Sequence, residues 1–381
     1  MKKIPINLIL PLWNKSYIDF FFSYSFLSLS SKGNLDFLSK NKSIFTFCVK
    51  KNEEKYVKNK IIKKKIFDKF NLKFIYIDSL LNLNNRKQLL HKIYLKGFRS
   101  EKRDHRKVYF LPITADEIYS SGSFYRLFLR VLKKKYDCVL ENKILVNSSF
   151  LSRLHKNKKK ISLSASSLIR LSIKDISNFS LNSILNTNLF FNYNATSIFY
   201  FIKNHGLICR GFLLHPVIIK PKKKIDKLNG FLDHYIVEEY ATSKKIFIID
   251  DANLFFKIGI DQNITDNFFP YDANKYAKSL NRWITKRHFY NSKTLTKIFY
   301  KKIKKQKYYF ENKIFSNLYF DLSSKLNTNF ISHKKHPRWI SSNVKKNYSM
   351  IFLCKKLLSP LKIIINTYKS IILFGFRKSR I

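Results

Sequence analysis

Paired carboxylates are the residues of this chain whose types and spacing could do chemistry. Glu238-Glu239 and Asp250-Asp251 could hold a divalent cation. The sequence has no glycine-rich phosphate loop, no His-Glu-x-x-His helix and no Gly-x-Ser-x-Gly elbow to accompany them. Its nine histidines are scattered, and only 24 residues are acidic. We therefore interpret both pairs as exposed turns and predict no catalytic residue, no metal site, no cofactor and no enzymatic activity.

Basic residues outnumber the acidic ones three to one. The chain has 74 Lys and Arg against 24 Asp and Glu, a formal net charge of +50. Such an excess repels itself in a compact fold, so it indicates a polyanionic partner. RNA, DNA and anionic lipid are the candidates. The 36 Phe and 22 Tyr distinguish the chain from a disordered basic tail and predict sizeable cores in two or three domains.

The cysteines and the apolar stretches give no sign of a special compartment. None of the four cysteines forms a Cys-x-x-Cys pair, so we expect reduced, buried thiols. Residues 4–29 and 360–376 are apolar but interrupted by Asn, Asp and Lys, so we interpret them as core elements and not as membrane spans. The start of the chain has neither a secretory cleavage site nor an Arg-rich presequence.

The sequence predicts some of the elements that would position the basic side chains. Residues 72–81 predict a strand that leads into a helix, and residues 113–136 predict a helix with Thr114 as its N-cap. The apolar positions of that helix share helical spacing. They are Phe124, Leu127, Phe128 and Val131.

Residues 194–226 contain the pattern on which the functional interpretation depends. The spacing of Ile198, Phe201 and Ile202 predicts a short helix, which Gly206 would end. Residues 207–209, 212–214 and 217–219 predict three short strands, followed by a lysine-rich run. A helix on a small sheet with cations at its turns suits contacts to the backbone of structured RNA.

The order of helix, His-Gly, short strand, turn Gly, Pro, strand and basic run resembles the alpha-L RNA-binding domain of small-subunit ribosomal protein S-four. A second segment, residues 336–380, resembles the tail of the same family through Pro337, Trp339 and Pro360. In this sequence Arg210 stands where the family usually has an Asn before the turn Gly. By analogy with the family, Trp339 is expected to anchor the core.

The resemblance implies an α+β fold: a helical and mixed N-terminal region, a small alpha-L-type domain with helices on a small antiparallel sheet, and C-terminal strands. The expected boundaries are a basic N-terminal region at 1–170, the RNA-binding domain at 171–235, a lysine- and tyrosine-rich insertion at 236–330 and a strand segment at 331–381. The expected RNA contacts are Lys203, His205, Arg210, Lys220, Lys222, Lys223 and Lys224.

The implied function is that of a structural constituent of an organellar small ribosomal subunit. Its partners would be small-subunit ribosomal RNA and neighbouring ribosomal proteins, with no membrane and no small-molecule substrate. The abundance of Lys, Asn, Ile, Phe and Tyr indicates an AT-rich genome, so we expect a mitochondrial location in preference to a plastid. Two alternatives remain open: an organelle-encoded RNA-processing factor such as an intron maturase, and a peripheral membrane protein held by its basic surface.

Overall fold

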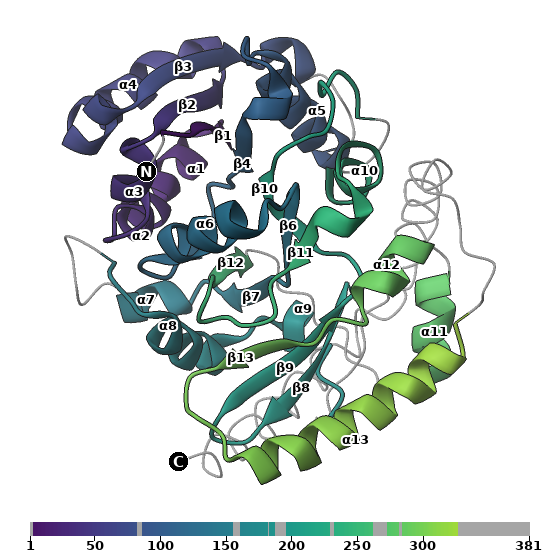
Figure 1. Ribbon diagram of the computed structural model, residues 1–381. Helices are drawn as coiled ribbons and strands as arrows, with labels where there is room; N and C mark the ends of the chain where they lie inside the picture. Colours follow the sequence, from purple (N-terminus) through teal and green to yellow (C-terminus); the bar gives the residue numbers. More distant parts are fainter. Residues whose placement is uncertain are drawn as a thin grey trace, which may run out of the picture. The chain divides into compact units, whose positions relative to one another are not determined.

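The computed structural model describes residues 3–81, 86–154, 161–181, 183–186, 196–228, 232–261, 273–281 and 284–326. These residues build a seven-stranded sheet and two three-stranded sheets, with helices around them (Figure 1). The helices are α1 (Lys15–Phe20), α2 (Phe26–Leu29), α3 (Leu35–Ser39), α4 (Glu54–Ile62), α5 (Arg86–Arg99), α6 (Ser123–Lys134), α7 (Phe150–Leu154), α8 (Ala165–Ser172), α9 (Asn178–Leu181), α10 (Leu232–Tyr240), α11 (Ala273–Asn281), α12 (Lys286–Asn291) and α13 (Lys305–Ser324).

The seven-stranded sheet has the order β3-β2-β1-β4-β10-β6-β11. Its parallel half pairs β1 with β2 and β4, and β2 with β3. β10 is antiparallel to both of its neighbours, while β11 is parallel to β6. The strands are β1 (Pro5–Pro11), β2 (Lys42–Val49), β3 (Asn71–Tyr76), β4 (Tyr109–Pro112), β6 (Cys138–Glu141), β10 (His215–Ile219) and β11 (Ile246–Ile248).

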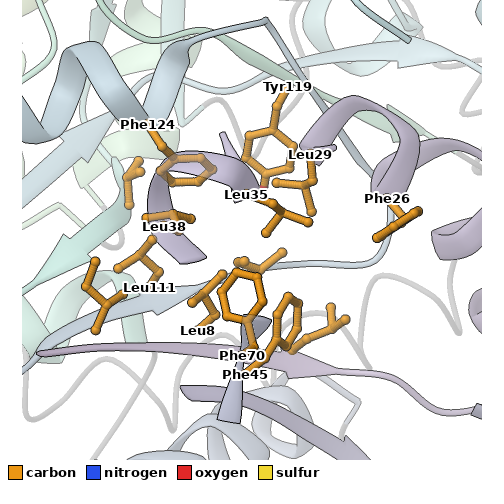
Figure 2. Packing of buried hydrophobic residues seen from close by; sticks show 14 of the residues in the cluster. Leu8, Phe26, Leu29, Leu35, Leu38, Phe45, Phe70, Leu111, Tyr119 and Phe124 are labelled. Carbon is orange, nitrogen blue, oxygen red and sulfur yellow. The ribbon is translucent and has the colours of Figure 1, made fainter. Parts of the chain in front are cut away.

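Both faces of this sheet are buried, as β1 illustrates. Leu8 and Leu10 belong to one apolar cluster and Ile9 to another, because successive side chains of a strand point to opposite faces. The first cluster is covered by α3, α4 and α6; Figure 2 shows Leu8, Phe45 and Leu111 on the same side of the sheet as Phe124. The second cluster is covered by α5 and α10. Burial on both faces explains the near-continuous apolar runs of these strands.

The two smaller sheets are formed by segments far apart in sequence. One has the order β5-β12-β7, with β5 (Glu117–Tyr119), β12 (Lys257–Asp261) and β7 (Ile144–Asn147). The other has the order β13-β9-β8, with β13 (Thr296–Phe299), β9 (Gly206–Gly211) and β8 (Ser197–Ile202). β5 follows β4 after four residues and β7 follows β6 after two, so the first small sheet begins at the edge of the large one.

The prediction of an alpha-L domain is wrong. Residues 198–202 form strand β8 and not a helix, because Ser-Ile-Phe-Tyr-Phe-Ile is a β-branched and aromatic run that is buried along nearly its whole length. A short apolar run of this kind fits a helix or a buried strand equally well by spacing. β8 and β9 are a hairpin in a small sheet, whereas β10 lies in the middle of the large sheet. The described residues therefore form an α/β fold around a large mixed sheet, and the predicted α+β fold with a small RNA-binding domain is wrong.

Several local predictions are confirmed. The residues predicted as the apolar face of a helix, Phe124 to Val131, are buried in α6, although this helix begins at Ser123 and Thr114 does not cap it. Residues 72–76 lie in β3, and residues 217–219 lie in β10. The three described cysteines, Cys48, Cys138 and Cys209, are buried free thiols. The second segment of the resemblance, residues 336–380 with Trp339, lies outside the described residues, and the four-part domain division stays a prediction.

Candidate active site at the carboxyl edge of the large sheet

The strand order creates a switch point between β1 and β4. From β1 the chain continues to β2 and β3 on one side, and β4 then pairs with the other side of β1. In open α/β sheets, ligands bind in the crevice that such a reversal leaves outside the carboxyl ends of the strands. β6 ends at the same edge, and the antiparallel β10 begins there, with His215 directly opposite Glu141.

A cluster of four charged side chains lies at this edge, and we call it the Glu-Lys cluster. It consists of Glu117 at the start of β5, Glu141 at the end of β6, Lys143 after β6, and Lys257 at the start of β12. Lys257 Nζ lies 2.9 Å from Glu117 Oε1 and 2.7 Å from Glu141 Oε1. Lys143 Nζ lies 3.1 Å from Glu117 Oε1. Two carboxylates and two ammonium groups therefore neutralise one another in a buried site.

Burial and pairing act in opposite directions on these groups. Burial by itself would raise the pKa of Glu117, but Lys257 and Lys143 hold that pKa well below its usual range, and Tyr119 OH donates a hydrogen bond to Glu117 Oε2 at 2.6 Å. Burial would lower the pKa of Lys143, yet Glu117 and Asp116 raise it to about 12. Both groups are therefore charged at neutral pH.

Lys143 is the cluster member that reaches solvent. Its side chain is 16% exposed, against 4% or less for the other three. Gly259 of β12 lies beside the stem of Lys143, since a Cβ at this glycine would come within 2.3 Å of Lys143 Cε. The glycine thus leaves room for the lysine stem, and the ammonium group is held where an anionic ligand could meet it.

A histidine–carboxylate pair lies beside this cluster. His215, the first residue of β10, places Nδ1 3.2 Å from Oδ2 of Asp233 in the first turn of α10. His91 fixes the start of α10, because its Nδ1 accepts a 2.9 Å hydrogen bond from the backbone N–H of Leu232. His215 and Asp233 are 34% and 17% exposed. A carboxylate on one ring nitrogen orients an imidazole so that its other nitrogen can accept a proton.

The loops that follow β1, β2 and β3 are joined by polar contacts. Asn14, just after β1, has a backbone φ of +67°, and its side chain accepts a 2.8 Å hydrogen bond from Lys50 Nζ. Its backbone N–H donates to Glu53 at 3.1 Å. Asp78 accepts from the backbone N–H of Lys51 at 3.0 Å. A non-glycine residue at positive φ is strained, and such strain is found most often at ligand sites.

The loop after β4 contributes a polar atom without a partner. Thr114 Oγ1 is inaccessible to solvent and makes no hydrogen bond within the described part of the chain. The same loop is held by α5, since Tyr94 OH donates a 2.8 Å hydrogen bond to the carbonyl of Ile113. A buried hydroxyl without a partner costs about 1–3 kcal/mol of stability.

The acidic residues of this edge do not form a metal cage. Among the described residues, no group of three His, Cys, Asp or Glu side chains could hold a metal ion. At the Glu-Lys cluster the positions between the carboxylates are taken by Lys143 and Lys257. The acid pair Asp250-Asp251 is exposed, as expected, and follows β11, whose carboxyl end lies at this edge because β11 is parallel to β6.

The residues expected to contact RNA lie in two separate places. Lys203 and His205 lie in or beside the β8–β9 turn, whereas Lys222, Lys223 and Lys224 follow β10 and are exposed. Lys223 pairs with Glu239 at 3.4 Å. The RNA contacts of these residues stay predictions, but the structure does not gather them as a single alpha-L surface.

The two remaining predicted contacts have structural partners. Arg210 donates to the carbonyl oxygens of Ser292 and Lys293, and its guanidinium stacks over the Tyr319 ring at 4.5 Å. Burial lowers its pKa. Lys220 lies over the Tyr109 ring at 5.3 Å. These partners give both side chains a role in joining elements of the fold.

Comparisons with known proteins add solved structures of low similarity. No protein-family model and no curated protein sequence matches the chain. Staphylococcus aureus TarS in complex with UDP-GlcNAc is 12% identical with a TM-score of 0.37, over 89% of this chain and 79% of that one. Mouse xyloside xylosyltransferase 1 is 12% identical with a TM-score of 0.26, over 41% and 59%. A 4-diphosphocytidyl-2C-methyl-D-erythritol synthase from Anaerococcus prevotii is 11% identical with a TM-score of 0.26, over 37% of this chain and 55% of that one.

These findings correct the functional expectations. The ribosomal interpretation is wrong, because the segment that carried it belongs to two different sheets. The ribosomal RNA and ribosomal-protein partners fall with the resemblance. The maturase alternative, the absence of a small-molecule substrate and the absence of enzymatic activity, which rested on composition and on missing motifs, are corrected as well, because the chain has an open α/β sheet with a charged cluster at its carboxyl edge.

The site residues have only a weak signature in the sequence. They are spread over 141 positions, in no known motif: Glu117, Glu141, Lys143, His215, Asp233 and Lys257. Only the pairing of β4, β10 and β6 brings their strand ends to one edge. A usable clue was Glu141, a single acidic residue at the end of the apolar run Cys-Val-Leu-Glu.

Proposed function

We propose that this chain is a group-transfer enzyme whose substrate is a phosphate-activated small molecule, and that the substrate class is a nucleoside-diphosphate sugar. The observation that carries the proposal is the His215–Asp233 pair beside the Glu-Lys cluster, at the carboxyl edge of an open α/β sheet. This edge is where such sheets bind nucleotides.

The chemistry divides between two kinds of group. The imidazole of His215, oriented by Asp233, would accept the proton of an acceptor hydroxyl as its oxygen attacks the anomeric carbon. The new C–O bond forms while the bond from that carbon to the phosphate oxygen breaks. The negative charge then develops on the departing nucleoside diphosphate, where the Lys143 ammonium would stabilise it.

The nucleoside would lie toward the ends of β1 and β2. Half-buried Trp13 offers an aromatic face there, and the Asn14–Lys50 contact supplies amide and ammonium groups. Trp13 is also the one tryptophan within the described residues, so its fluorescence can report binding near the end of β1 in a variant that lacks Trp283 and Trp339.

The test is transfer and binding by the purified full chain with a panel of nucleoside-diphosphate sugars. We expect Asp233→Asn and His215→Ala to lower the rate of nucleoside diphosphate release by about 10²–10⁴-fold, as loss of a general base does. Affinity for the nucleoside diphosphate itself should change less than about threefold, because neither side chain faces the phosphates in this scheme. Lys143→Ala should instead weaken that affinity about tenfold or more.

Asp68→Asn is the matched control for the aspartate, since Asp68 is exposed and precedes β3, at the opposite edge of the large sheet. The proposal is overturned if no member of the panel binds, or if Asp233→Asn and Asp68→Asn release the nucleoside diphosphate at the same rate as the unchanged chain.

A further inference from the structure

Helix α13 has a face that packs and a face that does not. Phe315 and Leu322 are buried in the cluster that α13 makes with β8, β9 and α11. Arg210 of β9 stacks on Tyr319, and Tyr200 OH donates a 2.9 Å hydrogen bond to Glu311. These contacts fix the rotation of the helix on the sheet, along whose outer side it runs (Figure 1).

The opposite face of α13 presents aromatic rings to water. Phe310 is 63% exposed and Phe320 is 73% exposed, and Lys313 and Asn317 between them are exposed as well. Spacings of three, four and three residues keep these four side chains on one line of the helix. Tyr309, 71% exposed, lies beside that line. We call this set of residues the outer stripe.

A basic hollow lies at the N-terminal end of α13. Its volume is about 700 Å³, which is in the range of small-ligand pockets. Lys297, Lys301, Lys302 and Lys305 line it together with Tyr300 and Tyr308, and no lining residue is acidic. The run from 301 to 307 holds five lysines and no acidic residue.

From these observations we infer that α13 is a docking surface for an anionic lipid bilayer. The outer stripe lies in the headgroup region, and the exposed lysines that precede the helix, Lys301 and Lys302, lie beside lipid phosphates. Phenylalanine rings have no hydrogen-bonding group, so full exposure to water favours an apolar boundary over a polar partner. Phe310 and Phe320 are ten residues apart on a straight helix, about 15 Å, which suits a planar surface. The lysines match negative lipid charge.

This docking surface is separate from the candidate active site. None of the residues in the outer stripe belongs to the carboxyl edge of the large sheet. Within the described part of the chain every helix is too short or too polar to cross a bilayer, so α13 would lie along the surface. Failure of membrane binding and failure of sugar transfer can therefore be told apart.

The experiment is flotation of the full chain with vesicles of phosphatidylcholine alone or with about one third phosphatidylglycerol. We expect binding to the anionic vesicles and little to the neutral ones. Lys301→Ala/Lys302→Ala should weaken partitioning about 10- to 30-fold, from the contribution of two lysines at an anionic surface. Phe310→Ala/Phe320→Ala should abolish the part of the binding that persists at high salt.

Two variants serve as matched controls. Lys133→Ala/Lys134→Ala removes the same charge from exposed positions of α6, and Ile62→Ala removes an apolar side chain that is 76% exposed on α4. Both should float like the unchanged chain. All variants change exposed side chains, so their unfolding midpoints and nucleoside diphosphate binding should not differ from those of the unchanged chain.

The inference fails if the chain does not float with anionic vesicles, or if the α13 and control variants lose binding equally. It also fails if glycerol phosphate binds in the hollow while the chain binds neither the neutral nor the anionic vesicles. Binding of single-stranded RNA that the α13 variants abolish, without vesicle binding, would overturn it in the same way.

Discussion

Lys257 is the residue on which the candidate site depends most for its stability. Its ammonium group lies between Glu117 and Glu141, and all three side chains are at most 4% exposed. A buried carboxylate that loses its cation retains its desolvation cost without the compensating attraction. Removal of the Lys257 charge alone would therefore leave buried carboxylates without their cation.

Replacement of Lys257 by Met should lower the free energy of unfolding by about 3–5 kcal/mol, since buried Glu141 would lose its lysine and Glu117 would keep only Lys143. Urea unfolding monitored by circular dichroism measures this loss. Lys63→Met, at an exposed position just after α4, should stay within about 0.5 kcal/mol of the unchanged chain. A loss below about 1 kcal/mol for Lys257→Met would contradict the pairing described above.

Glu117 makes the stability depend on pH in a defined direction. Its pKa in the folded chain lies below the ordinary value of 4.5, so the charged form stabilises the fold. That contribution is complete above about pH 4.5 and is lost as pH falls toward the folded pKa. The stability difference between the unchanged chain and Glu117→Gln should therefore be constant near neutrality and shrink below about pH 4.5. An increase of the difference in acid would show that the carboxylate is not stabilised by Lys257 and Lys143.

At the scale of elements, the small sheet β13-β9-β8 depends on a close approach of two backbones. Gly206 has a φ of +141°, and a Cβ there would lie 2.1 Å from the carbonyl oxygen of Ile298 in β13. Asn204 in the preceding turn has a φ of +66°. The His-Gly pair that suggested the end of a helix thus belongs to a hairpin turn, for the same reason of backbone freedom.

Gly206→Ala should lower the free energy of unfolding by about 2 kcal/mol or more, for two reasons. The φ of Gly206 is unfavourable for a residue with a Cβ, and the methyl group would push β13 away from β9. Thermal and urea unfolding would measure this loss of stability. Lys203→Ala in the same turn is exposed and should leave the stability unchanged. Equal stability of the two variants would mean that β9 and β13 do not pair as described.

At the scale of the whole molecule, the net charge of +50 opposes the compact state. The described ion pairs leave most lysines without a carboxylate partner, since acidic residues number only 24. Self-repulsion of this kind is long-ranged and is screened by salt. That the charge indicates an anionic partner stays a prediction, which the vesicle experiment above would test.

Salt should therefore raise the melting temperature of the isolated chain. Most of the gain should come between about 0.01 and 0.1 M ionic strength, where the Debye length falls from about 30 to about 10 Å. Differential scanning calorimetry over a potassium chloride series would show it. A rise that continues linearly to molar salt would indicate general exclusion of salt from the surface instead of charge screening.

The mitochondrial location, which rests on composition, stays a prediction that cell fractionation would test.

The sequence by itself determined the local and compositional properties. Helical spacing correctly predicted the buried face of α6, apolar runs correctly predicted β3 and β10, and the cysteine count correctly predicted buried thiols. These properties depend on neighbours in the chain or on totals, so they need no tertiary information.

Tertiary structure alone decided the sheet order and the candidate site. Residues 198–202 fit a helix by spacing and became a strand because β9 was there to pair with them. Glu117, His215 and Lys257 carry no local pattern, since each is placed by the edge of a sheet assembled from distant segments. Strand pairing is a long-range choice made by burial and backbone hydrogen bonds together, and short apolar runs do not encode which partner they take.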